Sequence, residues 1–166
     1  MDQGSALEVK ILTVSDGVAT GVREDISGQN LQILLEGSGW TVKERKTVQD
    51  GADFVARALH SLAEDFHGLI VTTGGTGFGP RDQTPEGTRN VIEREAPGLA
   101  EAMRLANPLG RLSRAIAGTL GTCLVLNVPG SAKGSVECLE TVLDIADHAV
   151  RLLVDNADPH PSGQGS

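Results

Sequence analysis

The sequence lacks the surplus of basic residues that proteins binding nucleic acids or anionic membranes need. It has 14 Lys and Arg against 22 Asp and Glu, so its formal net charge is -8 at pH 7. Because both kinds of partner require a basic footprint, we expect no nucleic acid and no membrane among its partners. Any phosphate group that the protein binds must be held locally, by backbone N–H groups, a helix N-terminus, a few basic side chains or a divalent cation.

Long hydrophobic runs and cysteines are also scarce. No apolar stretch approaches the ~20 residues that span a bilayer, and the residues MDQGSALE lack the basic and then apolar pattern of a secretory signal. Cys123 and Cys138 have no CxxC spacing, which argues against a disulfide framework and favours buried thiols in a reducing compartment. We therefore expect a cytoplasmic protein with one domain over residues 7–156, between flexible polar tails at 1–6 and 157–166.

Short apolar runs alternate with segments of helical periodicity. Residues 9–14, 69–73 and 123–128 are typical of buried parallel strands, and residues 41–48 of a more exposed strand. Apolar residues recur at helical spacing around 31–35, over 55–66, and over 136–153, where we expect one long helix. The alternation predicts a doubly wound α/β fold whose three apolar strands form the sheet centre. Ligands then belong at the carboxyl ends of the strands.

A glycine-rich loop, GGTGFGPRDQTPE, follows the strand at 69–73. Its glycines allow positive φ and a close approach to a ligand, and consecutive N–H groups in such a turn can bind an anion. Two familiar motifs do not fit. A GxGxxG sequence starting at Gly75 would need glycine where Pro80 stands, and a Walker A loop would need Lys after Gly79. The loop is thus a phosphate loop of another kind or a plain strand-to-helix turn.

Two acidic positions flank this loop in the predicted fold. We expect Thr84 and Pro85 to be N-cap and first residue of a helix reaching Glu95, which places Arg81 and Asp82 at the rim. Arg81 could pair with phosphate and Asp82 could hold Mg²⁺. Alternatively, Arg81 could form a surface ion pair and Asp82 could be a turn carboxylate. Asp50, after the strand at 41–48, fits either a helix N-cap or a metal ligand.

Two further turns face the same edge of the predicted sheet. Ser15 and Asp16 follow the first strand, and Ser27 is expected to cap the next helix. Hydroxyl, carboxylate and free N–H groups there suit a heteroaromatic substrate rich in donors and acceptors. The third strand leads into a turn at 127–131, near Lys133, which could counter a phosphate or be solvated.

Six segments together resemble the MogA/MoaB family of molybdenum cofactor biosynthesis proteins, which is related to the plant and gephyrin G domains. They occur in order between residues 9 and 154. The segments are SDG at Ser15, DxSG at Asp25, TTGGTGFGPRDQTPE at Thr72, PGL at Pro97, LSRAIAG at Leu112 and NVPGSAKG at Asn127. The pattern is specific because these segments recur at matching intervals, which a lone glycine loop does not supply.

The resemblance implies a three-layer α/β/α molybdopterin-binding fold with a mostly parallel central sheet. It also implies Mg²⁺- and ATP-dependent adenylylation of molybdopterin with release of pyrophosphate, usually in a homotrimer or a dimer of trimers. Asp50 and Asp82 correspond to the essential catalytic pair and would hold the Mg²⁺. The nucleotide-binding residues are then Gly74, Gly75, Thr76, Gly77, Pro129, Gly130 and Ser131. To the substrate pocket we assign Ser15, Asp16, Thr73, Arg81, Ser113 and Asn127.

One departure and two alternatives accompany this interpretation. The family commonly has Pro before the first essential Asp, whereas Gln49 precedes Asp50 here, so we expect a looser loop. Some MoaB-type members bind the pterin without adenylylating it, so a non-catalytic carrier or scaffold is the alternative function. A dinucleotide oxidoreductase is disfavoured because the loop does not match the GxGxxG motif.

We expect Leu109 and Ile116 to be exposed, either at a trimer face or under a loop.

Overall fold

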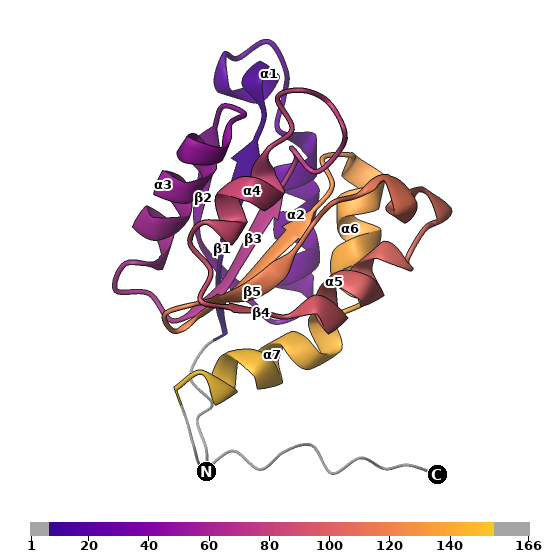
Figure 1. The fold of residues 1–166 in the computed structure, drawn as a ribbon. Coiled ribbons are helices and arrows are strands. Elements are labelled where there is room, and N and C mark those ends of the chain that lie inside the picture. The colour runs from indigo at the N-terminus through magenta and orange to yellow at the C-terminus, as the bar shows by residue number, and fades with distance from the viewer. Residues whose placement is uncertain (1–6, 155–166) are drawn as a thin grey trace.

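The computed structural model describes residues 7–154, so both expected tails lie outside the described residues. Strands and helices alternate along the chain (Figure 1). The strands are β1 (Glu8–Val14), β2 (Thr41–Val48), β3 (Gly68–Thr73), β4 (Arg94–Glu95), β5 (Ala117–Leu120) and β6 (Cys123–Val128). The helices are α1 (Asp16–Ala19), α2 (Ile26–Gly37), α3 (Ala52–Ala63), α4 (Thr84–Arg89), α5 (Pro97–Arg104), α6 (Ala132–Glu140) and α7 (Leu143–Leu152), with a 3₁₀ helix η1 (Pro108–Leu112).

The strands form one mixed sheet in the order β2-β1-β3-β6-β5-β4. Strands β2, β1, β3 and β6 pair in parallel, whereas β5 and β4 continue the sheet as antiparallel strands. The three apolar runs are thus central strands, and the mostly parallel α/β fold is confirmed. Because β1, β3 and β6 all run in one direction, their carboxyl ends meet at one edge of the sheet.

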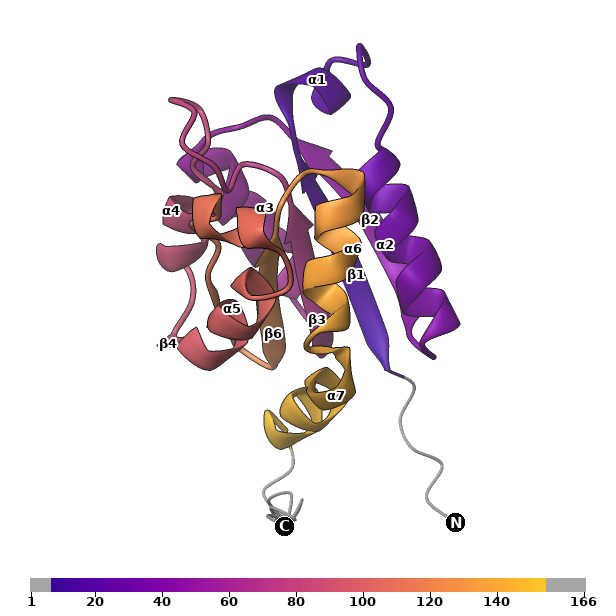
Figure 2. The same ribbon diagram turned by 90° about the vertical axis from the view of Figure 1, so that its right-hand side faces the viewer.

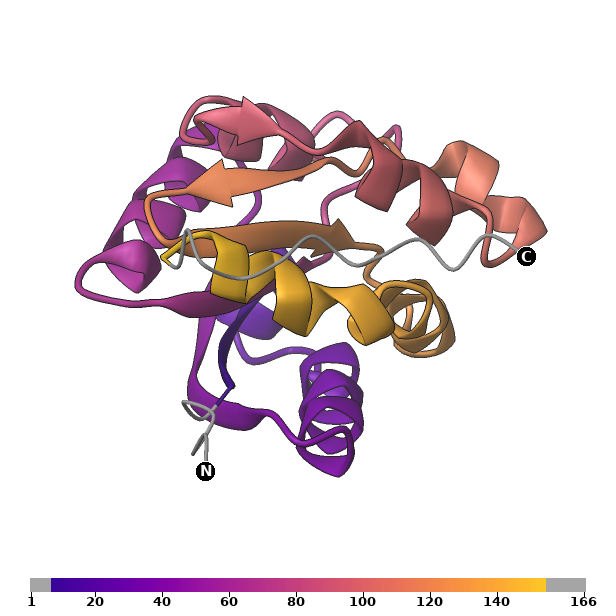
Figure 3. The ribbon, with the colours of Figure 1, turned by 90° about the horizontal axis from the view of Figure 1, so that it is seen from below.

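Helices cover both faces of the sheet, so the molecule has three layers (Figures 2 and 3). Alternate side chains of β1 enter different cores, because successive residues of a strand point to opposite faces. Val9 and Ile11 pack with α2, α5, α6 and α7, while Leu12 and Val14 pack with α3. Trp40, the only tryptophan in a chain without tyrosine, is buried in the first core just before β2 begins. Both cysteines are buried thiols, as predicted.

The last helical segment is two helices, so the prediction of a single helix over 136–153 was wrong. The Thr141 hydroxyl donates to the Cys138 carbonyl at 2.6 Å, and Val142 has left helical geometry with φ −123° and ψ −3°. After this break α7 runs across the end of the sheet opposite the glycine loop (Figures 1 and 3). Leu139, Ala146 and Val150 nevertheless enter the same core. The apolar spacing therefore continues through the break and conceals it.

Three further predictions were wrong. The helix that begins at Thr84 ends at Arg89 instead of Glu95, and residues 94–95 instead form the edge strand β4. The N-cap of this helix is Gln83, so Thr84 and Pro85 are its first two residues. Leu109 is 70% exposed as expected, but Ile116 is only 6% exposed because its segment packs against β6, where its N–H donates to the Asn127 side chain.

Candidate functional site

The glycine loop leaves the carboxyl end of β3 and is folded back onto α4. The Thr84 hydroxyl donates to the Gly74 carbonyl at 2.8 Å, and the Thr84 N–H donates to the Gly75 carbonyl at 3.0 Å. Gly74 and Gly75 have φ values of +99° and +68°. A Cβ at Gly75 would lie 2.2 Å from the Thr84 hydroxyl, and one at Gly74 would lie 2.2 Å from the Val14 carbonyl oxygen. Glycine is therefore required at both positions.

Two adjoining cavities flank this loop. The first has a volume of about 640 Å³ and the second of about 580 Å³. They share a wall made of Gly75, Asp82, Gly130 and Ser131. Two cavities that meet at one wall can hold two reactants side by side, so the arrangement suits a transfer between two bound molecules.

Most of the predicted site residues line one cavity or the other. The first cavity includes Ser15, Asp50, Thr73 and Gly74, and the second includes Thr76, Gly77, Ser113 and Pro129. Asp16, Arg81 and Asn127 line neither of them. The substrate-pocket set drawn from the sequence is thus divided between the two cavities, with part of it outside both.

Asp50 lies in a pair of carboxylates that exchange hydrogen bonds with each other's backbone. The Asp16 N–H donates to Asp50 Oδ2 at 3.0 Å, and the Asp50 N–H donates to Asp16 Oδ1 at 3.1 Å. Arg81 donates to both Asp16 carboxylate oxygens, at 2.6 and 3.1 Å, and to the Asp50 carbonyl at 3.2 Å. Arg81 therefore joins its own loop to the loop that follows β1 at Asp16 and to the loop that follows β2 at Asp50. Its charge is paired and is not directed into a cavity.

The two members of this pair differ in electrostatics. The hydrogen bond from Arg81 holds the pKa of Asp16 below its ordinary value. Burial raises the pKa of Asp50, and the negative charges of Asp16 and Asp82 add to that effect. A cation beside Asp50 would offset both causes. Asp50 was predicted as either a helix N-cap or a metal ligand; the N-cap of α3 is Gly51, so the capping interpretation is wrong.

Asp82 lies farther along the glycine-rich segment itself, after the glycines. Its Oδ2 accepts a hydrogen bond from the Gly79 N–H at 2.9 Å, and its own N–H donates to the Gly79 carbonyl. Within residues 7–154, Asp82 Oδ1 and Asp50 Oδ1 accept no hydrogen bond, so each carboxylate keeps one oxygen available. Carboxylate oxygens of this kind are the ligands that Mg²⁺ prefers. The pair therefore fits a divalent cation.

The described residues contain no cluster of three or more His, Cys, Asp or Glu side chains suited to a metal ion. A cation held by Asp50 and Asp82 would need phosphate or water oxygens to complete its coordination, as Mg²⁺ sites on nucleotides commonly do. In the same part of the chain, no helix is both long and apolar enough to cross a membrane.

Several polar residues near the site have structural roles that the sequence did not reveal. Asn127 is fully buried; its amide donates to the hydroxyls of Thr72 and Thr88 at 2.8 and 3.0 Å, so this amide serves the core and not a ligand. Asp25, not Ser27, caps α2, with its carboxylate accepting from the Gly28 N–H. The expected Ser27 cap was therefore wrong. Lys133 is exposed and pairs with Glu137 at 3.6 Å.

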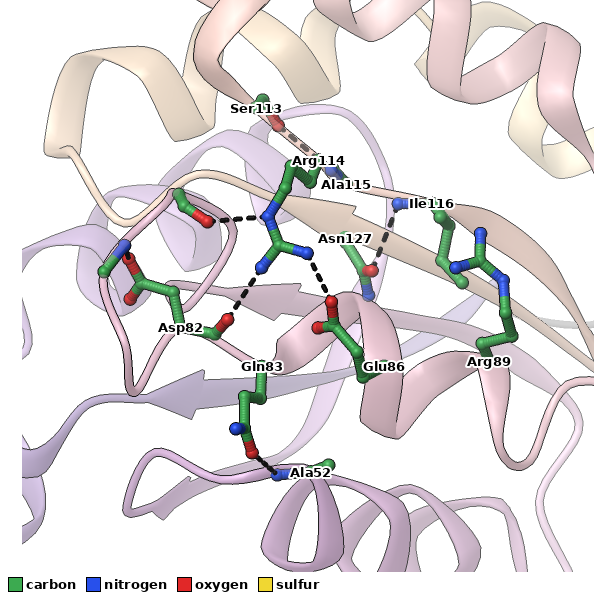
Figure 4. A network of polar contacts seen from close by, with 12 residues as sticks. Ala52, Asp82, Gln83, Glu86, Arg89, Ser113, Arg114, Ala115, Ile116 and Asn127 are labelled. Atoms are coloured by element: carbon green, nitrogen blue, oxygen red, sulfur yellow. Dashed lines mark hydrogen bonds and ion pairs between the residues drawn. The ribbon is translucent and has the colours of Figure 1, made fainter.

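Arg114 is the most connected residue near the site that sequence reasoning missed (Figure 4). It lies between η1 and β5 and contacts the loop at Thr76, Gly77 and Asp82. It also forms an ion pair with Glu86 of α4. Its place in the segment LSRAIAG was the only signal in the sequence, because contacts with backbone carbonyls leave no pattern in the partner residues.

The sequence of the chain matches a known protein family and several known proteins. Residues 10–148 match the family described as probable molybdopterin binding domain. The chain is 35% identical over 157 residues to the molybdopterin adenylyltransferase of Helicobacter pylori strain J99, covering 90% of this chain and 89% of the relative.

Solved structures agree with this match. The molybdopterin biosynthesis enzyme MoaB from Thermus thermophilus superposes with a TM-score of 0.83 at 42% identity, covering 89% of this chain and 96% of that one. The molybdopterin biosynthesis Mog protein from Mycobacterium ulcerans gives a TM-score of 0.82 at 37% identity, with coverage of 89% and 99%.

Proposed function

The chain belongs to the family of molybdopterin-binding domains, and from this membership we propose that it acts in molybdenum cofactor biosynthesis as a molybdopterin adenylyltransferase. One observation carries the proposal. The Asp50 carboxylate lies beside Gly75 and the Asp82 carboxylate beside Gly77 and Gly79, and both residues line the first cavity. Two carboxylates with an available oxygen each, beside a loop rich in N–H groups, suit the binding of a metal-bound triphosphate.

The proposed reaction joins molybdopterin to the adenylyl group of ATP. A terminal phosphate oxygen of molybdopterin attacks the α-phosphorus of ATP, and the bond from that phosphorus to the bridging oxygen of the β-phosphate breaks. Pyrophosphate leaves with the bridging electrons, and no covalent bond to the protein forms. Such a transfer asks the protein mainly for positioning and charge neutralisation.

The residues of this chain would divide these tasks. Asp50 and Asp82 would hold Mg²⁺, which neutralises phosphate charge when it is bound. The wall formed by Gly75, Asp82, Gly130 and Ser131 separates the cavities and would bring the two phosphate-bearing substrates together. Because Arg81 is engaged by Asp16, it would orient the Asp50 loop instead of contacting phosphate directly.

We further propose a homotrimer in the cytoplasm. Leu105, Leu109 and Leu112 on and around η1 are all exposed large apolar side chains. Such a group is a candidate surface for self-association. Light scattering at several protein concentrations measures the oligomeric state, and a monomer throughout would contradict the trimer without affecting the proposed chemistry.

Pyrophosphate release tests the function directly. Purified protein with molybdopterin, ATP and Mg²⁺ is expected to release pyrophosphate, whereas omission of any one component abolishes release. Molybdopterin binding without pyrophosphate release would instead establish the non-catalytic carrier.

A further inference from the structure

We propose that Arg114 is a positioning residue that fixes Asp82 against the glycine loop, with Glu86 holding its guanidinium in place. The kinetic consequence of this inference rests on the proposed function, whereas its structural consequence does not. Arg114 lies in neither cavity lining, so it would act through Asp82 and the loop instead of touching a substrate.

Arg114 connects both ends of the loop segment. Its backbone N–H donates to the Thr76 carbonyl at 2.8 Å, and its Nε donates to the Gly77 carbonyl at 2.8 Å. Its Nη2 donates to the carbonyl of Asp82 at 2.7 Å, as Figure 4 shows. Arg114 thus joins Thr76 and Gly77, early in the loop, to Asp82, later in the same loop.

The local contacts of Asp82 explain why it needs this support. The hydrogen bonds of Asp82 to Gly79 lie within its own four-residue turn. They keep the turn's internal shape but do not fix its place relative to the rest of the loop. The guanidinium anchors the Asp82 carbonyl to Gly77 on one side and to Glu86 of α4 on the other. Arg114 therefore helps to fix the position of the Asp82 backbone, from which the carboxylate projects.

The ion pair with Glu86 orients the guanidinium and adds little stability. The Arg114 and Glu86 side chains are 30% and 45% exposed, and solvent weakens ion pairs of that exposure. The Arg114 contacts that matter for the loop go to carbonyl oxygens, and those of the side chain depend on the planar fork of the guanidinium. A lysine would keep the charge but could not make these bonds together. Arg114→Lys therefore separates geometry from charge.

The chain offers a matched control at the other end of α4. Arg89 pairs with Glu95 at 3.0 Å, and both side chains are exposed. The Arg89 guanidinium is directed to Glu95 and lies apart from the glycine loop in Figure 4. Arg89→Lys alters a comparable ion pair on the same helix without altering the loop.

The structural test is backbone amide hydrogen exchange of residues 76–82 in the protein without substrates. Arg114→Lys is expected to speed exchange in this segment about tenfold, because anchored and released loops differ by such local opening free energies. Glu86→Gln is expected to speed it by less, about threefold, because solvent weakens the partly exposed ion pair that it removes. Arg89→Lys is expected to match the wild type. Unchanged exchange in both loop variants, or equal acceleration in the control, would overturn the proposal. If Arg114→Lys does not fold, Glu86→Gln alone decides.

Two functional readouts distinguish positioning from general stability. Mn²⁺ binding in the presence of a non-hydrolysable ATP analogue is expected to weaken about tenfold in Arg114→Lys, the lower end of the cost of losing an outer-shell partner. The kcat is expected to fall while the KM for molybdopterin stays nearly constant. A rise in KM with unchanged kcat and Mn²⁺ affinity would contradict the role. If the wild type releases no pyrophosphate, the proposed function fails, but the exchange and Mn²⁺ results still decide the role of Arg114.

Discussion

The two carboxylates that flank the glycine loop are held in different ways. Asp50 exchanges hydrogen bonds with a second carboxylate residue, Asp16, so its surroundings are dominated by like charge and burial. Asp82 is held instead through its own turn and its backbone, by Gly79 and the Arg114 guanidinium. The surroundings of Asp50 therefore raise its pKa, whereas the contacts of Asp82 fix its position.

Removing the charge of either carboxylate tests the role proposed for both, which is to hold Mg²⁺. Asp50→Asn and Asp82→Asn should each lower pyrophosphate release by about 10²- to 10³-fold, since each removes a group that would stabilise phosphate charge through the metal. The measurement is steady-state pyrophosphate release at saturating Mg²⁺, with circular dichroism to confirm folding. A folded variant with wild-type turnover would show that its carboxylate is not part of the machinery.

A substitution at Gly75 tests the geometry of the glycine loop beside Asp50, whose Oδ1 would lie 3.3 Å from an added Cβ. Gly75→Ala places a Cβ against the Thr84 hydroxyl at a φ of +68° and should lower the free energy of unfolding by about 1–3 kcal/mol. Gly21→Ala is the matched control, because Gly21 has a φ of +82° but nothing within 4 Å of an added Cβ. Denaturant unfolding measures both, and equal losses would show that the contact with Thr84 is unimportant.

A substitution at Asp16 tests the charge on the Asp50 side. Asp16→Asn removes a negative charge that raises the pKa of Asp50, so the pKa of Asp50 should fall. Asp50 then stays ionised to lower pH, and the acid limb of the pH–activity profile should move to lower pH by up to about one unit. Asp53→Asn, on the first turn of α3, is the control. An acid limb that does not move, or moves upward, would contradict the coupling.

The smallest expected effect concerns the ion pair between Arg114 and Glu86. Arg114 lowers the pKa of Glu86, so the pair stabilises the folded protein above the unfolded-state pKa of Glu86 and loses this contribution as pH falls through the lower folded-state pKa. Because the side chains are partly exposed, Glu86→Gln should cost less than about 1 kcal/mol at neutral pH and almost nothing in acid. Unfolding free energies at the two pH values measure this. A cost independent of pH would show that charge is not its source.

The fold was predictable where one physical signal dominated. The runs at 9–14, 69–73 and 123–128 are buried on both faces, so their apolar composition marked them as central strands. The two-residue strand β4 was not predictable, because its pairing with β5 depends on tertiary contact and not on local pattern. The break before α7 was likewise hidden, since the apolar stripe continues across it.

The site was predictable from loops but not from contacts between loops. The glycines of residues 74–77 and the carboxylates at 50 and 82 were identified from spacing and resemblance, and the structure brings them together. Asn127 was assigned to the substrate pocket from the family resemblance, yet its amide is used within the core. Of the two roles that the sequence left open for Arg81, the structure shows the surface ion pair; its partner, Asp16, could not be named beforehand because it lies 65 residues away in the sequence. Pairings of this kind are set by the fold alone.

The burial of Trp40 determines what the protein's intrinsic fluorescence can report. With no tyrosine in the chain, near-ultraviolet emission comes almost entirely from this one indole. The indole precedes β2 and so lies near the amino ends of the strands, away from the glycine loop. Its emission should shift to longer wavelength when the first core unfolds and stay nearly constant when a nucleotide binds. The same optical signal can therefore follow unfolding in the presence of ligand, leaving binding to be measured with a second probe placed near the loop.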